Sequence, residues 1–155
     1  YLTIQSIRFP GKFLFDCSVP NSLMDFRIPT FILQPLVENS IEHGFSDKEE
    51  QCYISIGYSL DESHLHLLIS DNGCGIPEGL LREIMDAMAS ENDRAKLSSS
   101  SGNGRSHHAI GLLNVDQRLR SYYGPEYGIS YQSKPGEGTR AVVKIPLPER
   151  LGGNV

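Results

Sequence analysis

The sequence lacks several features that mark whole classes of protein. No apolar run approaches the roughly 18–20 residues that cross a membrane, and there is no signal-peptide pattern. The formal net charge is −5 with no basic stripe to offset it, which argues against a nucleic-acid partner. The few cysteines (Cys17, Cys52 and Cys74) are widely spaced, so they indicate neither a disulfide framework nor a zinc site and fit a reducing cytosol. Internal repeats are absent as well.

What remains is typical of one globular domain. The chain has 155 residues, of which 39% are hydrophobic and 21% charged. Because it begins at Tyr1 and not at methionine, we expect residues 1–155 to be a single domain of a longer protein. The patterns predict, after an amphipathic lead-in over residues 1–12, a strand at 13–19, a helix at 29–45, strands at 53–58 and 65–70, helices at 78–89 and 110–123, and strands at 128–133 and 139–147. This order predicts a two-layer α/β sandwich, with a mixed, mainly antiparallel sheet and helices on one face.

The predicted helix at 29–45 organises the rest of the chain. An apolar stripe recurs every four residues along it, and Asn39 and His43 lie one turn apart beside that stripe. We expect Pro29 in the first turn, a kink at Pro35, and a left-handed stop at Gly44. Taken alone, the Asn–His pair could equally be a solvated polar edge.

A junction that carries glycines follows the strand at 65–70. Asp71 closes that strand, and Gly73 and Gly75 follow before the helix at 78–89. The segment could be an ordinary Asn-Gly turn, but a hairpin needs a returning strand and the next residues have helical period. Glycines at these positions let the backbone approach a ligand, and a carboxylate can accept a hydrogen bond from an exocyclic amine. By contrast, His64 and His66 are most simply solvent-facing strand residues.

Residues 90–109 interrupt the pattern. They include the low-complexity run 98–104, with Gly102 and Gly104, and Gly111 follows at the expected start of the next helix, where free N–H groups favour phosphate. We expect this segment to be a lid that is mobile without nucleotide and ordered by it. The alternative is a passive surface linker.

Together these motifs resemble a known family. The segments Leu-Gln-Pro-Leu-Val-Glu-Asn at 33–39, Asp71-x-Gly73-x-Gly75, Ile-Gly-Leu-x-Asn-Val-x-x-Arg-Leu at 110–119 and Gly138-Thr139 stand in the order seen in the ATP-binding catalytic domains of sensor histidine kinases. These domains belong to the wider group (GHKL, HATPase) that includes gyrase, Hsp90 and MutL. The residues of these segments are similar to those of the LytS/YesM type, and the resemblance covers about residues 1–148. The resemblance implies the Bergerat ATP-binding fold.

The resemblance also implies a set of site residues and cofactors. Asn39 matches the asparagine that ligates Mg²⁺, Asp71 matches the aspartate that accepts a hydrogen bond from the adenine amino group, and Thr139 matches a threonine that supports that contact. The full set of implied ATP-binding positions is Asn39, His43, Asp71, Gly73, Gly75, Ile76, Gly104, Gly111, Leu112 and Thr139. The implied cofactors are ATP and Mg²⁺.

Two positions depart from relatives in this group. ATP-hydrolysing members carry a glutamate where this chain has Pro35, and many kinase relatives carry a lysine where it has Glu42. Glu38 lies about 100° round the helix from Asn39, so geometry makes it a poor substitute for the missing base.

The implied function is transfer of the γ-phosphoryl group of ATP to a histidine in an upstream dimerisation region that this chain does not contain. The implied partners are that region and a response regulator. We expect the fragment to be monomeric and inactive in autophosphorylation alone, and the full-length protein to be a homodimer. The domain would be cytoplasmic, on a protein anchored in the bacterial inner membrane. The alternatives are a protein-serine kinase of the anti-sigma type and a nucleotide-binding regulator without catalysis.

Overall fold

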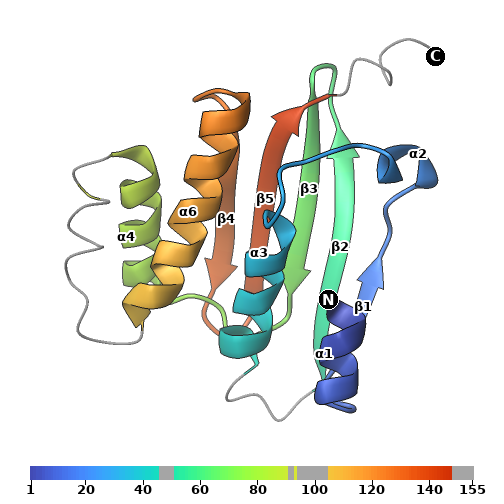
Figure 1. Ribbon diagram of the computed structural model, residues 1–155. Coiled ribbons are helices and arrows are strands. Elements are labelled where there is room, and N and C mark those ends of the chain that lie inside the picture. The colour runs from blue at the N-terminus through green and yellow to red at the C-terminus, as the bar shows by residue number, and fades with distance from the viewer. Residues whose placement is uncertain (46–50, 91–92, 94–104, 148–155) are drawn as a thin grey trace.

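A five-stranded sheet forms one layer of the molecule and helices form the other (Figure 1). The structure is a computed structural model and describes residues 1–45, 51–90, 93 and 105–147. Its strands are β1 (Phe13–Cys17), β2 (Cys52–Leu60), β3 (His64–Asp71), β4 (Gly128–Lys134) and β5 (Gly138–Pro146). Its helices are α1 (Leu2–Arg8), α2 (Asn21–Met24), α3 (Leu33–Asn39) with the π-helical turn η1 (Ser40–Gly44), α4 (Glu78–Ala89) and α6 (Arg105–Tyr123). None of the helices within these ranges is both long and apolar enough to span a membrane.

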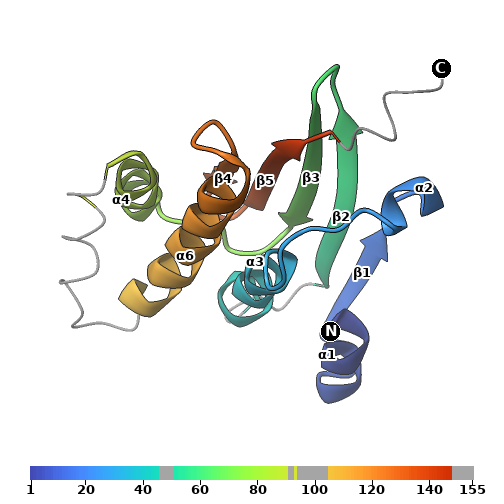
Figure 2. The same ribbon diagram turned by 45° about the horizontal axis from the view of Figure 1, so that its top comes forward.

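The strands are arranged in the order β1-β2-β3-β5-β4. β1 pairs with β2 in parallel, and the other neighbours are antiparallel. Figures 1 and 2 show α3, α4 and α6 on the same face of this sheet. The predicted two-layer sandwich, with its mixed and mainly antiparallel sheet, is therefore confirmed.

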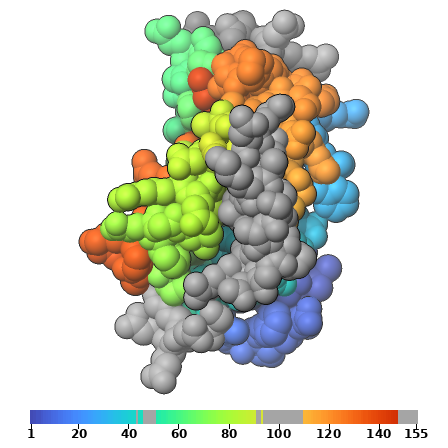
Figure 3. Space-filling view, turned by 90° about the vertical axis from the view of Figure 1, so that its left-hand side faces the viewer, coloured from blue at the N-terminus to red at the C-terminus, as the bar shows by residue number. Residues whose placement is uncertain are grey.

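The core lies between the two layers. Alternate residues of the strands point toward the helices, as the two-residue period of a strand requires. Ile54, Leu65, Val143 and Ile145 are 0–1% exposed, and they pack with Leu36 and Val37 of α3 and Leu119 of α6 in one hydrophobic cluster. Helix α4 covers the sheet at β4, and its buried residues are Ile84, Ala87 and Met88. Figure 3 shows α4 at the surface beside the orange α6.

Most of the predicted strand and helix boundaries are confirmed to within a few residues, but the helix predicted at 29–45 differs. It begins at Leu33 and not near Pro29, because Phe31 has a left-handed φ of 60° that ends any helix extending back through it. Pro35 therefore lies in the first turn, where backbone N–H groups have no helical partner, and it causes no kink. Gly44 does not have a positive φ, so the predicted left-handed stop is wrong.

Helix α6 also begins earlier than predicted. Arg105 to Ala109 are helical, so the predicted start at Ile110 is wrong and Gly111 lies inside the helix. Of the predicted lid at 90–109, residues 91–92 and 94–104 lie outside the described residues, and Gly102 and Gly104 fall within that part.

Candidate nucleotide site

The carboxylate of Asp71 is the centre of the candidate site. The sheet register places the end of β3 opposite the start of β5, so that Asp71 pairs with Thr139, 68 residues away in the sequence. Asp71 Oδ1 accepts hydrogen bonds from the backbone N–H groups of Gly73 at 2.9 Å and Thr139 at 3.1 Å. Two amide donors fix the carboxylate in one orientation, at the helix-covered end of the strand.

Ser40 holds the other carboxylate oxygen. Its hydroxyl donates to Asp71 Oδ2 at 2.7 Å, and the residue is only 4% exposed. Ser40 begins η1, a π-helical turn in which the hydrogen bonds join residues five apart. Such turns are often found at functional sites. Sequence reasoning missed this residue. The signal was available, because Ser40 is a polar residue on the same buried stripe as Leu36 and Val37, at positions i+4 and i+3.

Glycines allow the chain segments around Asp71 to pack without side chains between them. A Cβ on Gly73 would lie 2.4 Å from the carbonyl oxygen of Gly44, and one on Gly138 would lie 2.1 Å from that of Asp71. Gly75 has a φ of 73°, and a Cβ there would lie 2.2 Å from the carbonyl oxygen of Lys134. The sequence predicted that Gly73 and Gly75 let the backbone approach a ligand. At all three positions the atoms in close contact with the glycine belong to the protein backbone.

A pair of hydroxyls supports the same region from β4 and β5. Ser133 Oγ and Thr139 Oγ1 are 2.9 Å apart, and Ser133 also accepts a hydrogen bond from the backbone N–H of Ile76 at 2.8 Å. Thr139 thus meets Asp71 through its backbone N–H, and its hydroxyl bonds to Ser133. Ser133 is a second residue that sequence reasoning missed.

Asn39 lies at the end of α3, one residue before Ser40. It is half-buried, and its carboxamide has no hydrogen-bond partner within the part of the chain that the structure describes. Its amide oxygen could serve as a hard ligand for a cation. The backbone of His43 belongs to η1, and the position of its side chain lies outside the described structure.

The chain was then compared with known proteins. Residues 25–149 match the family model described as histidine kinase-, DNA gyrase B-, and HSP90-like ATPase. The chain belongs to this ATPase family.

Its relatives are bacterial sensor proteins. The chain is 29% identical over 153 residues to the sensor protein LytS of Bacillus subtilis, covering 99% of this chain and 24% of the relative. It is 32% identical over 146 residues to the sensor histidine kinase BtsS of Escherichia coli, covering 94% of this chain and 22% of that protein. It therefore spans about a quarter of the length of these relatives.

Solved structures agree on the fold. The catalytic domain of histidine kinase ThkA superposes with a TM-score of 0.58 at 18% identity, covering 94% of this chain and 86% of that one. The histidine kinase domain from the blue-light activated kinase of Erythrobacter litoralis EL346 gives 0.55 at 19% identity, covering 94% of this chain and 57% of that chain. The fold is thus that of histidine kinase ATPase domains, as the resemblance implied.

Of the remaining predicted site residues in this ATPase-family domain, two are buried in the core and one is a glycine within α6. Ile76 and Leu112 are buried in the core, 8% and 3% exposed, and so can contribute only a small apolar surface to a ligand. Gly111 lies within α6, and apart from its chain neighbours and its own helix backbone no atom of the described residues lies within 4 Å of where its Cβ would stand. Because α6 begins at Arg105, free N–H groups at a helix start are not available at Gly111.

A buried carboxylate fixes the position of α6 on the sheet. Asp116 is 0% exposed, accepts a hydrogen bond from the backbone N–H of Ile129 at 2.9 Å, and pairs with Arg120 Nε at 2.7 Å. A Cβ on Gly128 would lie 2.3 Å from Asp116 Oδ1, so the glycine is required for this contact. The helix that carries Gly111 and Leu112 is therefore held by a polar anchor, which sequence reasoning also missed.

Two tyrosines near this anchor have raised pKa values. Burial, with a smaller contribution from the negative charge of Asp116, raises the pKa of Tyr131 far above its ordinary value. Burial also raises the pKa of Tyr123, with a smaller contribution from Tyr122. The hydroxyls of Tyr131 and Tyr123 are buried without a hydrogen-bond partner among the described residues.

Proposed function

We propose that this domain binds Mg-ATP and supplies its γ-phosphoryl group to a histidine in an upstream dimerisation region of a two-component sensor kinase. One observation carries the proposal, namely the anchored Asp71 carboxylate in a chain of the ATPase family. The relatives named sensor protein and sensor histidine kinase support the assignment to signal transduction.

The residues around Asp71 suit an adenine. The carboxylate already accepts three hydrogen bonds, and its two oxygens together have about four acceptor sites, so one remains for an exocyclic amine. Because the donors from Gly73, Thr139 and Ser40 fix its orientation, the remaining acceptor is preorganised before any ligand binds.

The residues at the other end of the candidate site suit a metal-bound phosphate. When bound, ATP would supply the phosphoryl group and Mg²⁺ would neutralise its charge. Asn39 offers one hard oxygen, and this is the kind of sparse protein ligation that Mg²⁺ accepts when phosphate and water complete its shell.

The chain's own residues favour transfer over hydrolysis. Pro35 occupies the position at which ATP-hydrolysing relatives carry a general base, and it has no group that could activate water. Glu42 is exposed and brings a negative charge where many kinase relatives have a lysine. Bound phosphates would therefore depend on the metal to neutralise their charge.

Phosphoryl transfer in trans tests the proposal. The domain is mixed with a separately produced upstream region of the full-length protein and with Mg²⁺ and γ-labelled ATP. We expect label in the upstream region that is lost in acid and stable in base, and less label with Asp71→Asn at ATP concentrations near the wild-type Kd. Nucleotide binding without any acid-labile label would refute the transfer and leave a binding domain, and label on serine would indicate the anti-sigma type of kinase.

The same proposal extends to the assembly. The response regulator would receive the phosphoryl group from that histidine, and the full-length homodimer would be anchored in the inner membrane with this domain in the cytoplasm. Residues 1–155 would act as one domain, since the described elements share one core.

A further inference from the structure

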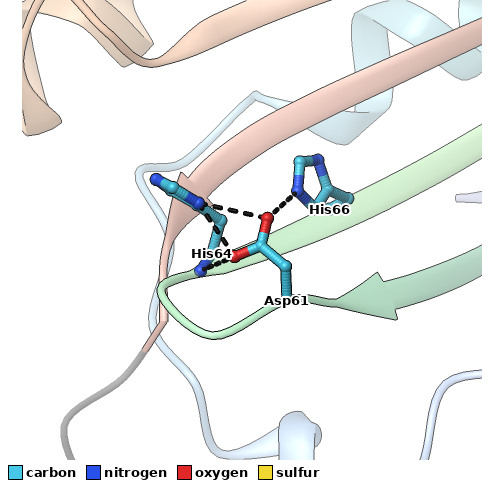
Figure 4. A group of neighbouring side chains, drawn as sticks. All are labelled: Asp61, His64 and His66. Atoms are coloured by element: carbon cyan, nitrogen blue, oxygen red, sulfur yellow. Dashed lines mark hydrogen bonds and ion pairs between the residues drawn. The ribbon is translucent and has the colours of Figure 1, made fainter.

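The β2–β3 turn carries a cluster of ligand side chains that the nucleotide site does not use. Asp61 lies in the turn, and His64 and His66 follow on the first and third residues of β3. Because β3 ends at Asp71, the cluster and the nucleotide site stand at opposite ends of the same strand. Figure 4 shows both imidazoles directed toward the carboxylate.

The distances within the cluster are short. Asp61 Oδ2 lies 3.0 Å from His66 Nε2 and 3.2 Å from His64 Nδ1. One ligand atom from each residue falls within 4.8 Å of the other two. In a tetrahedral metal site with bonds of about 2.1 Å, adjacent ligand atoms lie roughly 3.4 Å apart. Small rotations of the side chains would therefore bring these atoms onto one ion.

The turn fixes the carboxylate of Asp61, whose Oδ1 also lies 2.9 Å from His64 Nδ1. Asp61 Oδ1 accepts hydrogen bonds from the backbone N–H groups of Ser63 at 2.9 Å and His64 at 2.8 Å. The His64 ring also packs edge to face against Tyr127, with 6.0 Å between the ring centroids. Two of the three ligands are thus already oriented by neighbouring groups, which lowers the entropy cost of binding.

We propose that Asp61 Oδ2, His64 Nδ1 and His66 Nε2 bind a divalent transition-metal ion of the Zn²⁺ class, with water in the remaining coordination positions. The exposed fractions of the side chains, 26% for His64, 24% for His66 and 50% for Asp61, allow an ion to enter from solvent. The site is open, in contrast to the closed four-ligand sites that hold structural zinc.

The neighbouring charge supports this class of metal. Lys144 of β5 is the register partner of His66 on the same face of the sheet, and its ammonium opposes every cation there. Affinity must therefore come from the imidazole–metal bonds, which suit Zn²⁺, Ni²⁺ and Cu²⁺ and not the oxygen-seeking Mg²⁺ and Ca²⁺.

The rival explanation is a hydrogen-bonded turn without metal, because the same distances also fit imidazole N–H groups that donate to the carboxylate. Zn²⁺ binding to the whole chain distinguishes the two. Calorimetric titration with Zn²⁺ at about pH 7.5 measures this binding, and excess Mg²⁺ competes for the nucleotide site. The variants are the double substitution His64→Ala with His66→Ala, the conservative Asp61→Asn, which keeps the turn acceptor, and the control Glu62→Gln in the same turn.

We expect the wild-type chain and Glu62→Gln to bind one equivalent of Zn²⁺ that the double variant does not bind with comparable affinity. The Kd should rise more than tenfold in the double variant and in Asp61→Asn, since even outer-shell partners contribute tenfold to a hundredfold. The double variant keeps the other three histidines, so it measures background binding. Co²⁺ should give a visible absorption band in the wild type and lose it in the double variant. Equal Zn²⁺ stoichiometry and Kd in the wild type and the folded double variant would overturn the proposal.

Discussion

Substituting Asp71 by asparagine should weaken nucleotide binding while changing the stability of the fold only slightly. In Asp71→Asn the amide oxygen can keep both backbone hydrogen bonds that Oδ1 now accepts, from Gly73 and Thr139. The amide nitrogen replaces Oδ2, and the Ser40 hydroxyl, now a donor at 2.7 Å, can rotate to accept from it. The fold therefore exchanges one charge-assisted bond for a neutral one, and we expect stability to fall by no more than about 1 kcal/mol.

The cost to nucleotide binding should be larger. The exocyclic amine of adenine would meet an amide donor where it now meets a carboxylate acceptor. Losing a charge-assisted bond and gaining a mismatch costs roughly 1.5–3 kcal/mol, or about a 10- to 150-fold increase in Kd. Calorimetric titration with a non-hydrolysable ATP analogue and Mg²⁺ measures this change, and thermal unfolding measures stability in parallel.

Asp16→Asn is the matched control. Asp16 is an exposed carboxylate on β1 that also accepts a hydrogen bond from a serine, Ser18, at 2.6 Å, but it lies on the strand at the opposite edge of the sheet from β4. Its substitution should leave the Kd unchanged. If Asp71→Asn remained folded and bound the analogue as tightly as the wild type, the assignment of Asp71 to adenine would be wrong.

Four further substitutions test the site and its supports. Asn39→Ala should weaken Mg-nucleotide binding in calorimetry and leave adenosine binding nearly unchanged, and equal losses for both ligands would exclude the metal role. Gly73→Ala should lower the free energy of unfolding by about 2–3 kcal/mol in urea titrations, because its Cβ would lie 2.4 Å from the carbonyl oxygen of Gly44. Asp116→Ala should cost about 3 kcal/mol in the same assay, since it leaves the Ile129 N–H and the Arg120 guanidinium without their buried acceptor. Tyr131 should make the domain sensitive to alkali: its pKa is raised in the folded state, so its contribution to stability is complete below the ordinary value of 10.0 and falls above it, by about 1.4 kcal/mol per pH unit. Tyr131→Phe should reduce that alkaline slope and, by removing a buried hydroxyl without a partner, stabilise the domain at neutral pH by about 1 kcal/mol; an unchanged slope would show that the buried phenol does not govern it.

The local pattern of the sequence was sufficient for most of the fold. The strands at 53–58 and 65–70 alternate with period two, and the helix at 78–89 has helical period, because these periods follow directly from backbone geometry. The structure confirms all three, with β2 and β3 longer by a few residues. The order of the motifs also carried the resemblance to the family, which the match over residues 25–149 confirms.

The boundaries of the helices depended on information that periodicity does not carry. Phe31 has a left-handed φ, and no local signal marks an aromatic residue for that conformation. The π-helical turn after Asn39 is equally hidden, although it directs Ser40 toward Asp71.

Contacts between distant segments were decided only by the tertiary structure. Asp71 meets Thr139 because β3 pairs with β5, and Asp116 meets Ile129 because α6 packs on β4. The cluster of Asp61, His64 and His66 is local in sequence, yet residues of a strand and its turn converge only when the turn folds back. The sequence alone thus predicted candidate residues for a nucleotide site, among them Asp71 and Thr139. Register and packing determined which of them meet, because hydrogen-bond partners far apart along the chain are set by the sheet and not by the local pattern.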